Sequence, residues 1–271
     1  MLSSTSRLLT RLLAVLYGVL GLILFLTPES SSAVFAWRVA PFSMMTIGAW
    51  CLGNAVHAWD AAQRWDWSVT YPSLVYLWAF GLLQGVVLVA FSANMTLNGF
   101  QAWLYLAALL VNVIAAVLGI IDAIRLRPQP AVVGAPVAAW VRVATVAFVG
   151  LAAFIAFGTI IARAGGAVTQ GGFFPDQMTL FTVRAFGAFY AAVGIGAIPL
   201  IWARGMGPIL GYGRNGIAFV VTITAAALFY FNQFDFATRP GGAFYLGVYV
   251  VLFIGAVFLL LRDRSQQGSH A

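Results

Sequence analysis

The stretch from Arg38 to His57 reads RVAPFSMMTIGAWCLGNAVH. It is an apolar segment close to the roughly 20 residues that a helix needs to cross a bilayer, with one arginine at its entrance. The stretch from Arg184 to Arg204, RAFGAFYAAVGIGAIPLIWAR, has the same character. In both, a glycine follows the first arginine ten residues later (Gly48 and Gly194). This pairing predicts that the chain consists of two tandem repeats of one helical unit.

The overall composition places the chain in lipid. Of its 271 residues, 62% are hydrophobic and only 8% are charged, with a mean hydropathy of +0.96, whereas a soluble domain carries about 25% charged residues. The net charge of +7 comes from 14 arginines and 7 acids, without lysine. Because the arginines stand singly near the ends of apolar runs, they fit anionic headgroups and not nucleic acid.

Apolar runs of membrane-spanning length recur along the whole sequence. We expect eight spans: 8–26, 37–58, 71–91, 100–121, 143–162, 180–203, 215–234 and 243–261. The polar stretch between the second and third spans, Asp60 to Trp67, is expected to be a loop. Its tryptophans are typical of anchors at the membrane surface.

The first span has a second interpretation. Arg7 and Arg11 precede an apolar run and Ser31-Ser32-Ala33 follows that run, which is also the pattern of a cleaved signal peptide. We favour a retained span, because its counterpart in the second half, Val143 to Ala162, is uncharged and cannot be a signal.

The residues from 128 to 138 contain prolines and a glycine and form the one credible linker. We therefore expect a first four-helix repeat at 1–127, a cytoplasmic linker at 128–138, a second repeat at 139–264 and a polar tail at 265–271. Matched pairs support this division: Arg11 with Arg142, Arg38 with Arg184, Ala102 with Ala243, and Asp122 with Asp263. The predicted fold class is an all-α integral membrane protein with eight transmembrane helices in two tandem, parallel repeats.

The arginines also predict an orientation. With both termini in the cytoplasm, ten arginines are cytoplasmic, and four lie outside: Arg38, Arg163, Arg184 and Arg239. Positive charge favours the cytoplasmic side, so we expect this arrangement.

Two of the outer arginines, Arg38 and Arg184, are the sharpest candidates for a site. If the second helices of the two repeats face each other, both guanidiniums could hold a phosphate or carboxylate. The alternative is structural: each arginine reaches lipid headgroups or pairs with an acid of a loop, such as Glu29 or Asp176.

Three amides at membrane depth, Asn54, Gln84 and Asn112, are further candidates for a ligand-binding site. The alternative is that they join helices through hydrogen bonds. Asp, Glu, Lys and Arg are absent from the middle of every expected span, whereas ion-coupled carriers and proton pumps usually need such a group.

The sequence predicts no cofactor, metal or catalytic group. Cys51 is the only cysteine, so an internal disulfide or a thiolate metal cluster is excluded. His57 is the only histidine within a span, so a haem with two histidine ligands is excluded as well. Hydrolase, metalloprotease and nucleotide-binding motifs are absent.

Several features together carry a resemblance: Arg38 through Gly48, the tryptophan-rich loop to Trp67, then Phe91 and Trp103. The pattern resembles bacterial multi-pass proteins of uncharacterised function that are built from four-helix units. The resemblance implies a bacterial plasma (inner) membrane location and no particular chemistry.

The functional expectation follows from these absences. The first hypothesis is a non-enzymatic structural, accessory or interaction subunit, whose partners are the lipid bilayer and a protein partner or a second copy of itself. The alternative is a carrier or binder of a small anionic or lipid-like molecule between the repeats. A membrane redox subunit with a quinone-like substrate is the second alternative.

Overall fold

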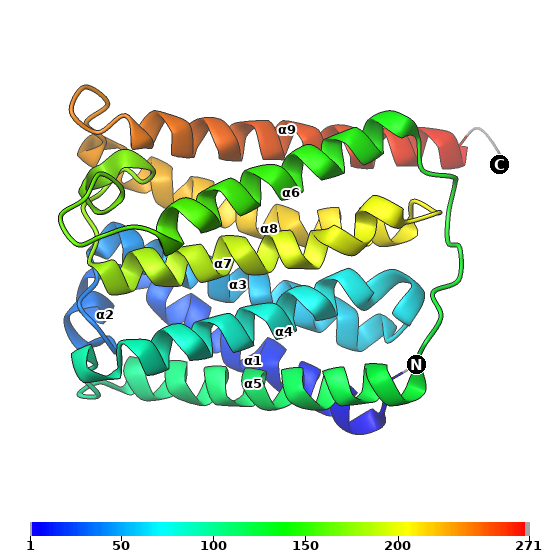
Figure 1. The fold of residues 1–271 in the computed structure, drawn as a ribbon, viewed down its shortest axis with the longest axis horizontal. Helices are drawn as coiled ribbons and strands as arrows, with labels where there is room; N and C mark the ends of the chain where they lie inside the picture. The colour runs from blue at the N-terminus through cyan, green and yellow to red at the C-terminus, as the bar shows by residue number, and fades with distance from the viewer. Residues whose placement is uncertain (1, 269–271) are drawn as a thin grey trace.

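A computed structural model describes the backbone of residues 2–268 and the side chains of residues 2–258 and 261. The described part is a bundle of long helices that run side by side and alternate in direction (Figure 1). The helices are α1 (Ser4–Leu26), α2 (Pro28–Val34), α3 (Pro41–Arg64), α4 (Trp67–Ala90), α5 (Phe100–Leu126), α6 (Ala139–Ile160), α7 (Leu180–Ala197), α8 (Gly207–Phe229) and α9 (Gly241–Gly268). The beginning of α1 and the end of α9 lie at the same end of the bundle.

Seven of the described helices are long and apolar enough to cross a membrane, namely α1, α4, α5, α6, α7 with its 3₁₀ extension, α8 and α9. The prediction of a multi-pass, all-helical membrane protein is therefore confirmed. The remaining long helix, α3, has 24 residues but carries Asp60 and Arg64 in its last turns. It lies inside the bundle, in contact with both α1 and α8.

Helix α3 differs from its predicted bounds at both ends. It begins at Pro41 and not at Trp37, because a proline suits the first turn of a helix and pushes the residue before it into extended backbone. Ala40 has that extended conformation, with φ −70° and ψ 152°. Arg38 thus lies before the helix, and the prediction that it opens the helix is wrong. At the other end, Asp60 and Arg64 are helical, so the polar loop is shorter than expected.

The bundle has two halves that a single segment connects. Helices α1 to α5 fill the lower part of Figure 1 and α6 to α9 the upper part. Across the interface, α3 packs on α8, and α4 packs on α7 and α8. The expected linker is non-helical and joins the two halves. Hydrogen bonds hold it against the bundle: Gly207 N donates to Val133 O at 2.8 Å, and Ala131 N donates to Ser68 Oγ at 2.9 Å.

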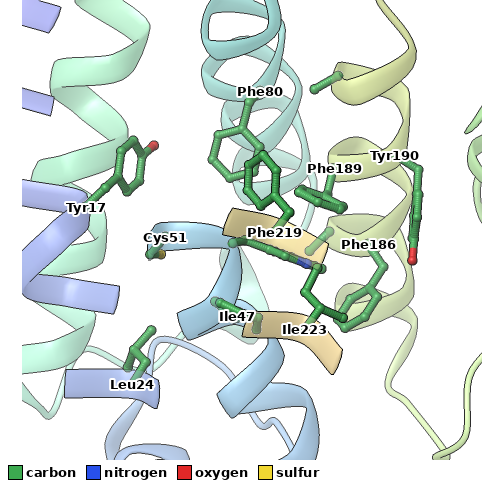
Figure 2. Packing of buried hydrophobic residues seen from close by; sticks show 14 of the residues in the cluster. Tyr17, Leu24, Ile47, Cys51, Phe80, Phe186, Phe189, Tyr190, Phe219 and Ile223 are labelled. Carbon is green, nitrogen blue, oxygen red and sulfur yellow. The ribbon is translucent and has the colours of Figure 1, made fainter. Parts of the chain in front are cut away.

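The core lies where the halves meet. Trp50 of α3 stacks on Phe189 of α7 with ring centroids 4.6 Å apart, and Phe219 of α8 packs edge-on against Phe189 at 5.4 Å. Figure 2 shows Phe186, Phe189 and Tyr190 on one helix, with Phe189 directed toward Phe219. The halves are therefore joined by interlocked aromatic rings.

The glycines that suggested a repeat do not occupy equivalent places. A Cβ atom on Gly48 would lie 2.6 Å from Phe25 N, in the last turn of α1. A Cβ atom on Gly194 would lie 3.3 Å from Ala152 Cβ, two turns before the end of α6. The register that aligned these two glycines is wrong. The side chain of Asp263, another member of the matched pairs, lies outside the described residues, as do residues 269–271 of the expected tail.

Candidate functional site

A pocket of about 350 Å³ lies at the end of the bundle where the segment before α3 meets the start of α7. Arg38 is the lining residue from the first half, and the others come from the segment between α6 and α7 and from the first residue of α7. They are Ala164, Gly165, Thr169, Gln170, Gln177, Met178, Thr179 and Leu180. We call this cavity the Arg38 pocket.

The residue next to Arg38 fixes its position. Trp37 is buried and stacks on Phe181 with ring centroids 4.3 Å apart and planes 18° from parallel. Its Nε1 donates a hydrogen bond to Thr182 Oγ1 at 3.2 Å. Both partners lie in the first turn of α7, so the contact holds Arg38 beside the beginning of that helix.

The pocket favours negative charge from two sides. The side chain of Arg38 is exposed and, among the described residues, makes no hydrogen bond or ion pair. Thr179 caps α7, accepting a hydrogen bond from Thr182 N at 3.2 Å. The N-terminus of a helix carries partial positive charge and free N–H groups, so it attracts anions. An uncommitted guanidinium next to a helix N-terminus can hold a phosphate or carboxylate.

The second predicted arginine has a different role. Arg184 lies in α7, but its guanidinium donates to the carbonyl of Thr159 and, at 3.0 Å, to that of Ala162. These carbonyls are at the C-terminal end of α6, where a cation stabilises the helix. Arg184 is not among the residues that line the Arg38 pocket.

The three predicted amides are buried inside the bundle, away from the lining of the pocket. Gln84 Nε2 donates to Ala185 O at 2.8 Å, and Asn112 Nδ2 donates to the Tyr17 hydroxyl at 2.9 Å. Asn54 Oδ1 accepts from the Tyr76 hydroxyl. Each amide thus makes a contact between helices, which is the alternative that the sequence left open.

A polar network that the sequence did not predict joins α3, α4 and α8. Asp60 accepts hydrogen bonds from Arg214 at 3.0 Å and from Asn215 at 3.1 Å. Asn215 also lies 3.4 Å from Ser73 Oγ, which is 3.0 Å from His57 Nδ1. The available signal was the spacing of His57 and Asp60, which places both on one face if the helix continues past Ala58.

The pocket side of the bundle also holds Asp176, in the segment between α6 and α7. Burial raises the pKa of its carboxyl, and the N–H of Gln177 and the guanidinium of Arg239 offset this only in part. Across the described residues, no three His, Cys, Asp or Glu side chains gather as metal ligands.

Comparisons of the chain with protein-family models, curated proteins and solved structures find no match. The resemblance drawn from the sequence is thus supported only at the level of a multi-pass, all-helical membrane protein.

Proposed function

We propose that the protein is a non-enzymatic, multi-pass membrane protein that binds a small anionic group in the Arg38 pocket. The observation that carries the proposal is the uncommitted guanidinium of Arg38 in a cavity that opens onto the N-terminus of α7. The volume of about 350 Å³ is at the lower end of the range for small-molecule sites.

Two sources could supply the anionic group: a free anion such as phosphate, or the phosphate of an anionic lipid headgroup. The segments that line the pocket lie at one end of the bundle (Figure 1), where headgroups surround a membrane protein. Their shared chemistry is a phosphate that accepts two N–H donors from Arg38 and further donors from α7.

Binding is favoured over carriage by the way the halves are joined. Gln84 bonds to Ala185, Trp50 stacks on Phe189, and Trp37 bonds to Thr182, all across the interface. A carrier that rocks one half against the other would have to break these contacts in each cycle. The interface therefore supports a fixed binding site.

The test is binding of two probes to the purified protein. Inorganic phosphate is titrated in detergent, and vesicles of phosphatidylcholine with or without phosphatidylglycerol are compared after reconstitution. We expect Arg38→Gln to weaken binding of one probe about tenfold. The control, Arg163→Gln, removes an exposed arginine of the segment between α6 and α7, and Arg163 does not line the pocket.

The affected probe identifies the source: phosphate indicates a free anion, and phosphatidylglycerol indicates a lipid headgroup. Equal affinities in the wild type and in Arg38→Gln for both probes would remove the proposal.

An accessory or interaction subunit remains a second candidate, and one observation favours it. Helices α6 and α9 are the least buried of the seven candidate spans. Each packs chiefly on one long neighbour, α6 on α7 and α9 on α8. A partner subunit or second copy would cover these apolar faces. Native mass spectrometry of gently solubilised membranes should then find a reproducible complex, and a lone monomer would count against this role.

We also infer that α3 is an eighth span and that two four-helix units share an ancestor. The helix contacts across the interface support this. If α3 corresponds to α7 and α4 to α8, the contact of α3 with α8 is the counterpart of the contact of α7 with α4. The arginine distribution supports an orientation with both ends in the cytoplasm, and the resemblance of the sequence implies the bacterial inner membrane as the location. Reporter enzymes fused to the two ends should report the same side, and opposite sides would contradict an even number of spans.

A further inference from the structure

A buried ring from a loop lies at the centre of an aromatic cluster. Phe174 belongs to the segment between α6 and α7, yet only 1% of it is exposed. Its ring centroid lies 4.9 Å from that of Phe186, and 6.4 Å from those of Tyr190 and Tyr245. Helices α7 and α9 supply these neighbours, so the phenyl ring of Phe174 is inserted into the bundle from one end.

Helix α3 presents polar groups to the same cluster. Ser43, Thr46 and Trp50 are three and four residues apart, which places them on one face of the helix. Trp50 contacts Phe186, with centroids 4.3 Å apart. Thr46 lies close to Tyr245 of α9. This face of α3 therefore looks toward the rings that surround Phe174.

Several of these groups are hydrogen-bond donors without an acceptor. Trp50 Nε1 and Ser43 Oγ are buried and make no hydrogen bond within the described residues. The Tyr245 hydroxyl makes none of normal geometry, although Thr46 and Tyr249 lie near it. The indole N–H can only donate, and buried polar groups are seldom left unpaired, above all in a membrane interior. Trp50 Nε1 thus lacks an acceptor among the described residues, and the hydroxyls of Ser43 and Tyr245 lack a partner of normal geometry.

We propose that this cluster is a binding site for a planar ring compound with acceptor oxygens on its edge, of the quinone class, and that Phe174 occupies the ring position in the empty protein. Phe186, Tyr190 and Tyr245 would enclose the ring faces. Trp50 Nε1 and the Tyr245 hydroxyl would donate to the carbonyl oxygens. Only binding is inferred, and the site is independent of the Arg38 pocket in its residues.

The segment that carries Phe174 contains two glycines in the left-handed region of the backbone. Gly165 and Gly171 have φ angles of 74° and 98°, which other residues rarely adopt. Binding would require Phe174 to leave the cluster, and rotation about these glycines would be the route that leaves α7 and α9 in place. Displacement of one aromatic ring by another keeps the apolar contacts and adds the missing acceptors.

The test compares two probes with the same ring system. Menadione, a naphthoquinone, carries two carbonyl oxygens, and 2-methylnaphthalene carries none. Equilibrium dialysis of the full-length protein in detergent, with protein-free micelles as the blank, gives both affinities. We expect saturable binding of menadione that is at least tenfold tighter than that of 2-methylnaphthalene, because only menadione satisfies the donors.

Variants locate the site. Trp50→Phe should weaken menadione binding about fivefold, whereas Trp103→Phe, which changes an exposed side chain, should leave it unaltered. Tyr245→Phe removes only a hydroxyl and should give a similar loss, so it serves if Trp50→Phe does not fold.

Phe174→Ala should tighten binding, because the competing ring is gone. Its control is Phe173→Ala, whose ring packs against Phe154 and Phe244 instead. Three outcomes would overturn the proposal: no saturable binding of menadione, equal binding of the two probes, or menadione affinity that neither Trp50→Phe nor Tyr245→Phe changes.

Discussion

Gln84 Nε2 of α4 donates a hydrogen bond of 2.8 Å to Ala185 O of α7, between residues 101 positions apart in the chain. Both residues are buried, with 2% and 1% of their surfaces exposed. The side chain thus joins the first half of the bundle to the second at membrane depth. In an apolar interior, no water can replace the bond if it is removed.

Gln84→Leu should therefore lower the free energy of unfolding by about 1 kcal/mol, the typical worth of a hydrogen bond between helices in a membrane. Unfolding of the detergent-solubilised protein in a denaturant series, followed by circular dichroism, measures the change. Gln129→Leu is the control, because Gln129 is exposed and, within the described part of the chain, its side chain bonds only to Arg127 O, at 3.4 Å. Equal losses for the two variants would show that the bond across the interface contributes nothing.

The close approach of α3 and α8 leads to a second prediction. A Cβ atom at Gly53 would lie 2.1 Å from the ring of Phe219, so the helices or the ring would have to move. Overpacking of this kind costs about 1–3 kcal/mol, more than the roughly 1 kcal/mol that alanine gains over glycine in a helix. Gly53→Ala should lower the thermal midpoint.

The matched control for Gly53→Ala is Gly150→Ala in α6, where no atom of the described residues lies within 4 Å of the added carbon. It should leave the thermal midpoint unchanged or raise it. A lower midpoint for both variants would mean that the loss at Gly53 does not come from contact with Phe219.

Composition and periodicity were enough to predict a multi-pass helical bundle, because the need to bury apolar residues in lipid acts on every span alike. The start of α3 was predicted too early, although Pro41 signalled it. The bonds of Gln84 and Asn112 could not be assigned to partners, since Ala185 and Tyr17 lie far away in the sequence. In the sequence, an amide at membrane depth that binds a ligand cannot be distinguished from one that joins two helices.

The Arg38 pocket was predicted only in part, for a related reason. The sequence marked Arg38 and Arg184 as a pair, because they share a residue type and a following glycine. In the structure Arg184 satisfies carbonyls at the end of α6, and Arg38 does not. Whether the guanidinium of an arginine is already hydrogen-bonded depends on which helix end lies beside it. For Arg184 this can be known only once the packing of α6 on α7 is known.

Adjacent residues of α8 give a third prediction, because both bond to Asp60 but differ in burial. The side chain of Arg214 is 44% exposed, whereas Asn215 is 3% exposed. Arg214→Gln should cost less than about 1 kcal/mol, as for most surface ion pairs. Asn215→Leu should cost about 1–3 kcal/mol, because the buried Ser73 hydroxyl and the partly buried Asp60 carboxylate each lose a donor. Denaturant titration should rank the two variants in this order, and the reverse order would contradict the network.

Two aspartates in segments outside the candidate spans should respond to pH with opposite signs. Burial raises the pKa of Asp176, whereas hydrogen bonds from the side chain and backbone of Thr238 lower the pKa of Asp235. A raised pKa means that ionisation disfavours the folded state. The stability that protonated Asp176 contributes is therefore lost as pH rises through its folded pKa. A lowered pKa means the converse, so the stability from Asp235 is lost as pH falls through its folded pKa.

At pH 7, Asp176→Asn should therefore raise the thermal midpoint and Asp235→Asn should lower it. The difference from wild type for Asp176→Asn should shrink as pH falls through the raised folded pKa and should vanish only below the unfolded-state pKa of about 3.9, where the carboxyl is protonated in both states. The difference for Asp235→Asn should persist to lower pH, because its folded pKa is depressed. Thermal melts between pH 3 and pH 8 measure both variants. If Asp176→Asn and Asp235→Asn moved the thermal midpoint in the same direction at pH 7, burial would not be what raises the pKa of Asp176.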